Sequence, residues 1–312
     1  MSTKVAVIQK PPVVLDRERT IARVVESINE AAGAGATLLV FPEAHISGYP
    51  AWIWRLKPGG DIALSSELHA RLRQSAVDLN RQDLRPLQDA ASKHAVTVVM
   101  GMNEIDSCYS GTTLFNTVVV IGSDGTLLNR HRKLMPTNPE RMVWGVGDAS
   151  GLRVVDTPAG RLGALICWES YMPLARYALY AQDLEILVNP TWDNGETCLV
   201  TLRHIAREAG CWVIGTATAL QGCDLSDDFP ERDRLYKPDE WINDGDAVVV
   251  NPAGKVTAGP LHREKGILYA EIDIEDARRA RRSLDVCGHY SRPDIFSLCV
   301  NRKPLQPVEF LD

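Results

Sequence analysis

The chain has 312 residues, of which 45% are hydrophobic and 24% are charged, the balance of a globular protein that can bury a core of normal size. Its formal net charge of −6 argues against nucleic acid or an anionic membrane as a partner, because such partners usually leave a basic footprint on the sequence. No apolar run approaches the length that spans a bilayer, so no membrane partner is expected.

The cysteines indicate the compartment. There are seven of them, an odd number, and they include no Cys-x-x-Cys pair. This pattern argues against a disulfide framework and against a ribbon-type zinc site. The first residues enter a strand directly and lack the anatomy of a signal peptide. We therefore expect a cytoplasmic protein without a structural metal.

Apolar periodicity predicts strands and helices that alternate along most of the chain. Strands are expected at residues 4–9, 37–41, 96–100, 114–121, 126–131, 152–156, 161–166, 185–189, 211–216, 247–251, 255–257 and 266–272, and helices at 17–34, 66–79, 83–94, 171–182, 197–209 and 273–282. Residues 221–245 are polar with few apolar anchors, which predicts a long loop. Hairpins mixed with helix-separated strands indicate an α/β fold in which paired sheets are covered by helices. We expect one domain over residues 1–312, with an irregular tail from about residue 284.

Cys167 stands between a predicted buried strand and the helix expected after it. A helix N-terminus offers free N–H groups and the positive end of the helix dipole, which favour thiolate over thiol. Cys167 is therefore a candidate nucleophile. The alternative is an inert core cysteine, which is common beside a hydrophobic strand.

A cysteine nucleophile requires a base, and its reaction requires charge stabilisation. No histidine stands in a recognisable Cys–His signature. Glu43 and Lys133 each follow the end of a predicted strand, where catalytic groups gather in α/β folds. Taken singly, Glu43 could instead cap the next segment, and Lys133 could be one more solvated cation in a basic run.

The segments that carry these residues resemble, in the same order, the Glu–Lys–Cys triad of the nitrilase superfamily. They are Phe-Pro-Glu-Ala at 41–44, His-Arg-Lys-Leu-Met-Pro-Thr at 131–137 and Leu-Ile-Cys-Trp-Glu at 165–169. Further segments similar to the family lie at 139–145, 189–192, 203–206 and 288–296, so the resemblance covers about residues 4–300. Cys-Trp-Glu at the nucleophile and His-Tyr-Ser-Arg-Pro-Asp in the tail are typical of the true nitrilase branch, whereas amidases and carbamoylases usually differ at both places.

The resemblance implies a four-layer α-β-β-α sandwich and a nitrilase, which converts a nitrile to a carboxylic acid and ammonia through a cysteine thioimidate and thioester. It implies that Cys167 is the nucleophile, that Glu43 is the general base and that Lys133 stabilises negative charge. Glu140 would be a second glutamate that positions Lys133. The partners would be a small-molecule nitrile and water, with no metal or organic cofactor.

Several residues near these motifs are candidate walls of a substrate pocket. They are Tyr49, Trp54, Trp168, Thr191 and Trp192. They could equally be core or interface residues, and their number does not separate aliphatic, aryl and arylacetonitrile substrates. The backbone N–H of Trp168 is a candidate additional donor to the substrate. Glu169 is expected to be structural, because an acid is favoured early in a helix.

The resemblance also implies a homodimer or a larger homo-oligomer, since true nitrilases often continue into spirals. Because the tail is short, the sequence does not decide whether the oligomer extends into a spiral. Two alternative functions remain: an amidase or carbamoylase of the same superfamily, and a non-catalytic scaffold. The intact Glu43, Lys133 and Cys167 argue against the scaffold.

Overall fold

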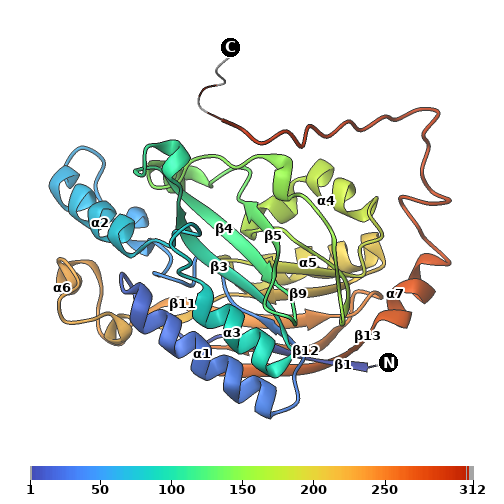
Figure 1. The fold of residues 1–312 in the computed structure, drawn as a ribbon, viewed down its shortest axis with the longest axis horizontal. Helices are drawn as coiled ribbons and strands as arrows, with labels where there is room; N and C mark the ends of the chain where they lie inside the picture. The colour runs from blue at the N-terminus through green and yellow to red at the C-terminus, as the bar shows by residue number, and fades with distance from the viewer. Residues whose placement is uncertain (1, 307, 309–312) are drawn as a thin grey trace.

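The computed structural model describes residues 2–306 and 308 and contains two packed β-sheets (Figure 1). The first sheet has the strand order β13-β1-β2-β3-β4-β5, and the second has the order β10-β11-β9-β8-β7-β6 with β12 beside β11. The strands are β1 (Ser2–Ile8), β2 (Leu38–Val40), β3 (Thr97–Ile105), β4 (Leu114–Ile121), β5 (Leu127–Arg132), β6 (Val155–Thr157), β7 (Gly160–Ala164), β8 (Ile186–Pro190), β9 (Trp212–Thr216), β10 (Ala219–Gln221), β11 (Trp241–Val250), β12 (Val256–His262) and β13 (Ile267–Asp273).

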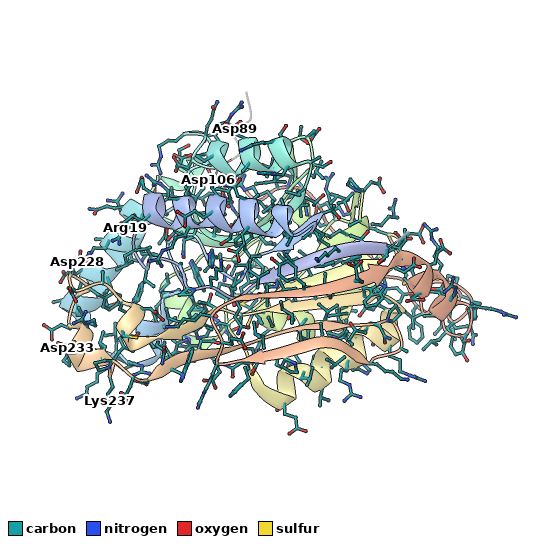
Figure 2. The ribbon with its side chains drawn as sticks, turned by 90° about the horizontal axis from the view of Figure 1, so that it is seen from below. Arg19, Asp89, Asp106, Asp228, Asp233 and Lys237 are labelled. Carbon is teal, nitrogen blue, oxygen red and sulfur yellow. The ribbon has the colours of Figure 1, made fainter. Side chains whose placement is uncertain are left out.

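Helices cover the outer faces of both sheets. The α-helices are α1 (Arg17–Gly33), α2 (Ile62–Ser75), α3 (Arg85–His94), α4 (Pro173–Tyr180), α5 (Gly195–Ala209), α6 (Arg232–Leu235) and α7 (Ile274–Arg281). Short 3-10 turns are η1 (Ala51–Trp54), η2 (Ser107–Tyr109), η3 (Asn138–Met142), η4 (Ala149–Gly151), η5 (Cys167–Tyr171) and η6 (Gly222–Asp224). Figure 2 shows the layers from the side, with charged side chains such as Arg19, Asp89 and Lys237 directed outwards.

The burial pattern explains the layers. In β1, Val5 and Val7 pack between the two sheets, whereas Ala6 and Ile8 pack on the other face against α1 and α3. This follows from the alternation of side chains along a strand. A separate core joins α4 and α5 to the outer face of the second sheet. The expected four-layer α-β-β-α sandwich is therefore confirmed.

Local sequence signals set several helix ends. Asp16 caps α1, because its Oδ1 accepts the backbone N–H of Arg19 at 2.9 Å. Gly210 ends α5 in the left-handed conformation, with φ of +57°, which glycine adopts without steric cost. Most predicted elements are present within a few residues, but α2 begins four residues before the predicted start at residue 66.

The prediction of a long loop at residues 221–245 is wrong in two respects. The segment contains η6, α6 and the beginning of β11. It also has four buried anchors in the core beside α2, namely Leu225, Phe229, Leu235 and Tyr236. The polar residues between these anchors hide them in the sequence, because the anchors follow neither a helical nor a strand period.

After α7 the chain continues as an extended tail, and residues 283–306 and 308 form no helix or strand. The tail passes beyond α7 and returns across the molecule (Figure 1). It is fixed near its end, since the Leu305 N–H donates to Asp148 Oδ2 at 2.8 Å. Within the described part of the chain, no helix has the length and apolar character needed to cross a membrane.

Candidate active site

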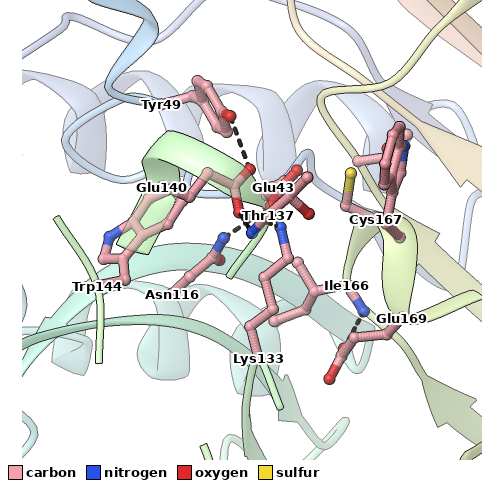
Figure 3. Close-up of polar contacts among 12 residues, drawn as sticks. Glu43, Tyr49, Asn116, Lys133, Thr137, Glu140, Trp144, Ile166, Cys167 and Glu169 are labelled. Carbon is pink, nitrogen blue, oxygen red and sulfur yellow. Dashed lines mark hydrogen bonds and ion pairs between the residues drawn. The ribbon is translucent and has the colours of Figure 1, made fainter. Parts of the chain in front are cut away.

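Three strand ends bring the predicted catalytic residues together between the sheets. Glu43 and Lys133 follow β2 and β5 of the first sheet, and Cys167 follows β7 of the second. The sulfur of Cys167 faces the two charged residues (Figure 3). All three are buried, with exposed fractions of 1%, 1% and 6%, respectively. Residues that are far apart in the sequence thus share one water-poor site.

Lys133 lies between two carboxylates. Its Nζ donates to Glu43 Oε1 at 2.8 Å and to Glu140 Oε2 at 2.7 Å. Glu140 Oε2 also accepts the backbone N–H of Thr137 at 2.7 Å, and Glu140 Oε1 accepts the hydroxyl of Tyr49 at 2.7 Å. Because η3 begins directly after Thr137, this cap turns the Glu140 side chain back toward Lys133.

The backbone of Cys167 has an unusual conformation. Its φ of +53° lies in the left-handed region, which a residue with a Cβ rarely adopts. Asn189 of β8 holds the turn, because its Nδ2 donates to the carbonyls of Leu165 at 2.7 Å and Cys167 at 3.1 Å. A strained conformation persists only where its surroundings fix it, and here they fix the direction of the sulfur.

The expectation that a helix N-terminus favours the Cys167 thiolate is wrong. The turn η5 is short and α4 begins only at Pro173, so no long helix dipole points at the sulfur. Burial has the largest effect and raises the pKa of Cys167, and the charge of Glu43 adds to this effect while Lys133 and Thr191 oppose it. Cys167 therefore rests as a neutral thiol and requires a base before it can attack.

The same buried environment shifts the pKa values of Glu43 and Lys133, the two charged neighbours of Cys167. Burial raises the pKa of Glu43 to about 7, although the charge of Lys133 opposes the shift. Burial lowers the pKa of Lys133, but the charge of Glu43, together with the charge and hydrogen bond of Glu140, acts in the opposite direction and the net shift is upward. The site therefore holds a permanent cation beside a carboxyl group that exchanges its proton near neutral pH, which suits a general base.

Glu169 is structural, but it does more than begin a helix. Its Oε2 accepts the backbone N–H of Ile166 at 2.5 Å, and its Oε1 accepts the backbone N–H of Leu134 at 2.6 Å. Ile166 precedes Cys167, and Leu134 follows Lys133. One buried carboxylate thus fixes the loops that carry Lys133 and Cys167 relative to each other.

A cavity of about 180 Å³ opens onto Cys167. The residues that line it are Tyr49, Trp54, Thr137, Glu140, Cys167, Trp168, Trp192 and Asp193. The rings of Tyr49 and Trp192 stack with centroids 4.2 Å apart, and Trp168 Nε1 donates to Asp193 Oδ2 at 3.0 Å. Four of the five candidate wall residues therefore line this cavity. The fifth, Thr191, does not: its side chain interacts with Cys167 and lowers the pKa of the thiol, and the residue borders a neighbouring cavity of about 340 Å³.

Asn116, Asn189 and Asp193 also belong to the site, although they were not predicted from the sequence. Asn116 Nδ2 donates to Glu43 Oε1 at 2.7 Å. Asn116 and Asn189 lie inside the apolar strands β4 and β8, and an amide in such a strand indicates a buried hydrogen-bonding role. Asp193 lies in a loop, where the sequence carries no comparable signal. Across residues 2–306 and 308, no group of three or more His, Cys, Asp or Glu side chains is placed to hold a metal ion.

The sequence of the chain is similar to that of known hydrolases. The carbon–nitrogen hydrolase family model matches residues 4–282. The chain is 39% identical to Nitrilase 2 of Arabidopsis thaliana, over 99% of this chain and 91% of that protein. It is also 39% identical to the aliphatic nitrilase of Sinorhizobium fredii, over 98% of this chain and 97% of that protein. The bifunctional nitrilase/nitrile hydratase NIT4A of Lupinus angustifolius is 37% identical, over 99% of this chain and 89% of that protein.

The fold is similar to that of solved members of the superfamily. Saccharomyces cerevisiae Nit3, a member of branch 10 of the nitrilase superfamily, has a TM-score of 0.73 and 21% identity over 93% of this chain and 96% of that chain. A carbon–nitrogen hydrolase from Helicobacter pylori G27 has a TM-score of 0.72 and 21% identity over 95% of this chain and 97% of that chain. The chain belongs to the carbon–nitrogen hydrolase family. Within that family, its sequence relatives place it in the nitrilase branch.

Proposed function

We propose that this enzyme hydrolyses a nitrile to the corresponding carboxylic acid and ammonia. The observation that carries the proposal is the buried Cys167 thiol facing a carboxyl group and a lysine, in a chain similar to nitrilases over almost its full length. A cavity of about 180 Å³ gives a small organic molecule access to the sulfur. The catalytic domain comprises the described fold from β1 to α7, and the tail lies against it.

In the proposed mechanism, Glu43 takes the proton of the Cys167 thiol as the sulfur attacks the nitrile carbon. A carbon–sulfur bond forms, the nitrogen gains the proton, and the product is a thioimidate. Water adds to this species with Glu43 as base, and ammonia leaves to give a thioester. A second water molecule releases the carboxylic acid and restores the thiol, so that two water molecules are consumed per nitrile.

Lys133 stabilises the negative charge that develops on the substrate. Two of its three N–H donors are used by Glu43 and Glu140, and the third has no hydrogen-bond partner among the residues that the structure describes; the ammonium group also lies 5.9 Å from the centre of the Trp144 ring. The third donor is therefore free for the substrate nitrogen, and later for the oxygen of the tetrahedral intermediate. Glu140 holds the lysine in place, and the backbone N–H of Trp168 adds a second donor beside the nucleophile.

Release of an amide is the alternative outcome at the tetrahedral intermediate. If the carbon–sulfur bond breaks before the carbon–nitrogen bond, the product is an amide. Two relatives, from Lupinus angustifolius and Nicotiana tabacum, are named as bifunctional nitrilases/nitrile hydratases, which supports testing for this product. An amidase function is tested with paired substrates: a nitrilase produces ammonia from the nitrile faster than from the matching amide.

The substrate range follows from the cavity walls. Stacked aromatic rings favour a flat or apolar organic group, and the small volume favours a compact one. A panel of aliphatic, aryl and arylacetonitriles, with acid, amide and ammonia all quantified, tests this assignment. The expected result is acid as the main product from at least one compact nitrile, and the absence of ammonia from every nitrile would contradict the proposal.

We also propose a homo-oligomer in a reducing compartment such as the cytoplasm. Large apolar side chains are exposed on η5 and α4 and on the tail, which favours a protein interface there; they are Trp168, Tyr171, Met172, Leu174, Tyr290, Ile295 and Phe296. All seven cysteines are free, which supports a reducing environment. Sedimentation velocity over a range of protein concentrations tests the assembly, with a dimer or larger species expected.

A further inference from the structure

The two oxygens of the Glu43 carboxylate have different surroundings. Oε1 accepts two hydrogen bonds, from Lys133 Nζ at 2.8 Å and from Asn116 Nδ2 at 2.7 Å. Oε2 is buried and has no hydrogen-bond partner. A buried carboxylate oxygen without a donor is costly, so such an atom in a native site calls for a functional explanation.

Asn116 is placed rigidly enough to impose this difference. It lies within β4 and is 1% exposed. Side chains two residues apart share a face of a strand, so Asn116 points to the same inter-sheet space as Val118. Its backbone carbonyl also accepts the backbone N–H of Lys133 at 2.8 Å. The same residue thus fixes the start of the Lys133 loop and one oxygen of Glu43.

We infer that Asn116 is a positioning residue that reserves Oε2 of Glu43 for the proton of the Cys167 thiol. Asn116 and Lys133 together hold Oε1 from two directions and prevent rotation of the carboxylate. Lys133 alone is a single donor that either oxygen could accept. Without Asn116, the carboxylate can turn, and the free oxygen is no longer held on the side of the sulfur.

The charged and titratable groups around this carboxyl group determine the expected effect of pH. They are Lys133 from the loop after β5, Glu140 from η3, Cys167 from η5, and Tyr49 from the loop before η1. The Asn116 hydrogen bond is one of the interactions that lower the pKa of Glu43 against the effect of burial. Its loss raises that pKa, so proton transfer from the thiol requires a higher pH.

Alkylation of Cys167 tests the inference without a nitrile. Iodoacetamide forms a carbon–sulfur bond and releases iodide, and the thiol proton passes to Glu43. The rate is measured from pH 5 to 9 by mass spectrometry of the peptide that contains Cys167, because three other cysteines are exposed. In Asn116→Leu, we expect alkylation at pH 7 to fall about fivefold and the midpoint of the pH profile to rise by about one unit.

Two further variants keep the test decisive. Asn116→Asp retains the size of the side chain and replaces the donor with an acid, so it should shift the midpoint upward even if the leucine variant does not fold. Asn129→Leu is the matched control, since Asn129 is buried on the neighbouring strand and donates to the carbonyl of Gly151 instead. Its Cys167 profile should match the wild type. Unchanged rates and midpoints in the folded Asn116 variants would overturn the inference.

The expected effect of Asn116 on turnover rests on the proposed function. The role of Asn116 and the nitrilase function are contradicted by different experimental results. In a nitrilase assay, Asn116→Asp should lower kcat more than it raises KM, because Asn116 does not line the substrate cavity. If the wild type hydrolyses no nitrile while the alkylation profile still shifts, the proposed function is wrong and the role of Asn116 stands. If nitrile is hydrolysed and the alkylation profile does not shift, the proposed function stands and the inferred role of Asn116 is wrong.

Discussion

Tyr49 joins the wall of the cavity to the ion cluster, because its hydroxyl donates to Glu140 Oε1 at 2.7 Å while its ring stacks on Trp192. The hydroxyl also accepts Trp54 Nε1 at 3.1 Å. Burial raises the pKa of Tyr49 well above 10, and Glu140 adds to the shift, so the group stays a neutral donor. The substrate wall and the residues that hold Lys133 are therefore one hydrogen-bonded unit.

Replacing this donor tests the coupling. Tyr49→Phe keeps the stacked ring but leaves Glu140 Oε1 without its donor, and a hydrogen bond to a charged group contributes about 1.5–3 kcal/mol. We expect kcat to fall about tenfold or more with a smaller change in KM. Steady-state kinetics on one nitrile measures both. Tyr109→Phe is the control, since that hydroxyl donates to the carbonyl of Leu305 in the tail; an equal loss in both variants would rule out a specific role for Tyr49.

The general base is tested by Glu43→Gln. The amide keeps the size of the carboxyl group but cannot accept the thiol proton, so we expect turnover to fall by roughly 10³-fold while the folded state persists. Turnover and thermal unfolding are measured together. Glu185→Gln provides a matched buried substitution, because Glu185 accepts the Arg161 N–H far from the cavity. Substantial turnover in a normally folded Glu43→Gln enzyme would exclude the base role.

The pH dependence of kcat/KM reports the protonation of Glu43 in the free enzyme. The carboxyl group must be ionised to accept a proton, and burial raises its pKa to about 7. Activity should therefore rise with pH through a midpoint near 7 and be lost as the pH falls below it. A pH–rate profile measured on a substrate that does not titrate provides the check. An acid limb near 4.5, the ordinary value for glutamate, would show that Glu43 is not the group that controls the rate.

Replacing Glu169 is expected to lower both stability and activity. In Glu169→Gln, one oxygen is replaced by a donor that cannot accept the N–H of Ile166 or Leu134, so a buried N–H is left without a partner. We expect the free energy of unfolding to fall by about 2 kcal/mol. Because both loops move, kcat should fall as well. Chemical denaturation and kinetics on the same preparation measure the two effects. Unchanged stability would show that the hydrogen bonds of Glu169 to the two loops do not stabilise the fold.

The sequence allowed the fold class and the residues that meet in the candidate active site to be predicted, because both have strong local signals. Glu43, Lys133 and Cys167 each stand in a distinctive segment that follows a strand, and the residues before Glu43 and Cys167 are apolar. The continuous apolar run Val5, Ala6, Val7 and Ile8 is likewise typical of a strand that is buried on both faces. The resemblance to the nitrilase superfamily then followed from the order of the segments, and the nitrilase branch followed from Cys-Trp-Glu at the nucleophile and the motif in the tail.

The hydrogen-bond partners of these residues depend on three-dimensional register, which no local pattern encodes. Asn116 reaches Glu43 only because β2, β3 and β4 are neighbours in one sheet. The state of the Cys167 thiol was also predicted wrongly, since burial outweighs a short 3-10 turn. The left-handed φ of Cys167 was not predicted, because a residue with a Cβ gives no sign of it.

In the proposed mechanism, Cys167 becomes covalently attached to the carbon of a nitrile. The most direct measurement is acid-quenched mass spectrometry of the enzyme during turnover of a compact nitrile, with acid and ammonia quantified in parallel. We predict an adduct with the mass of the thioimidate or thioester on the Cys167 peptide, equal amounts of acid and ammonia, and neither adduct nor product in Cys167→Ala. Ammonia production from the nitrile by Cys167→Ala, or an adduct on another residue during productive turnover, would contradict the account.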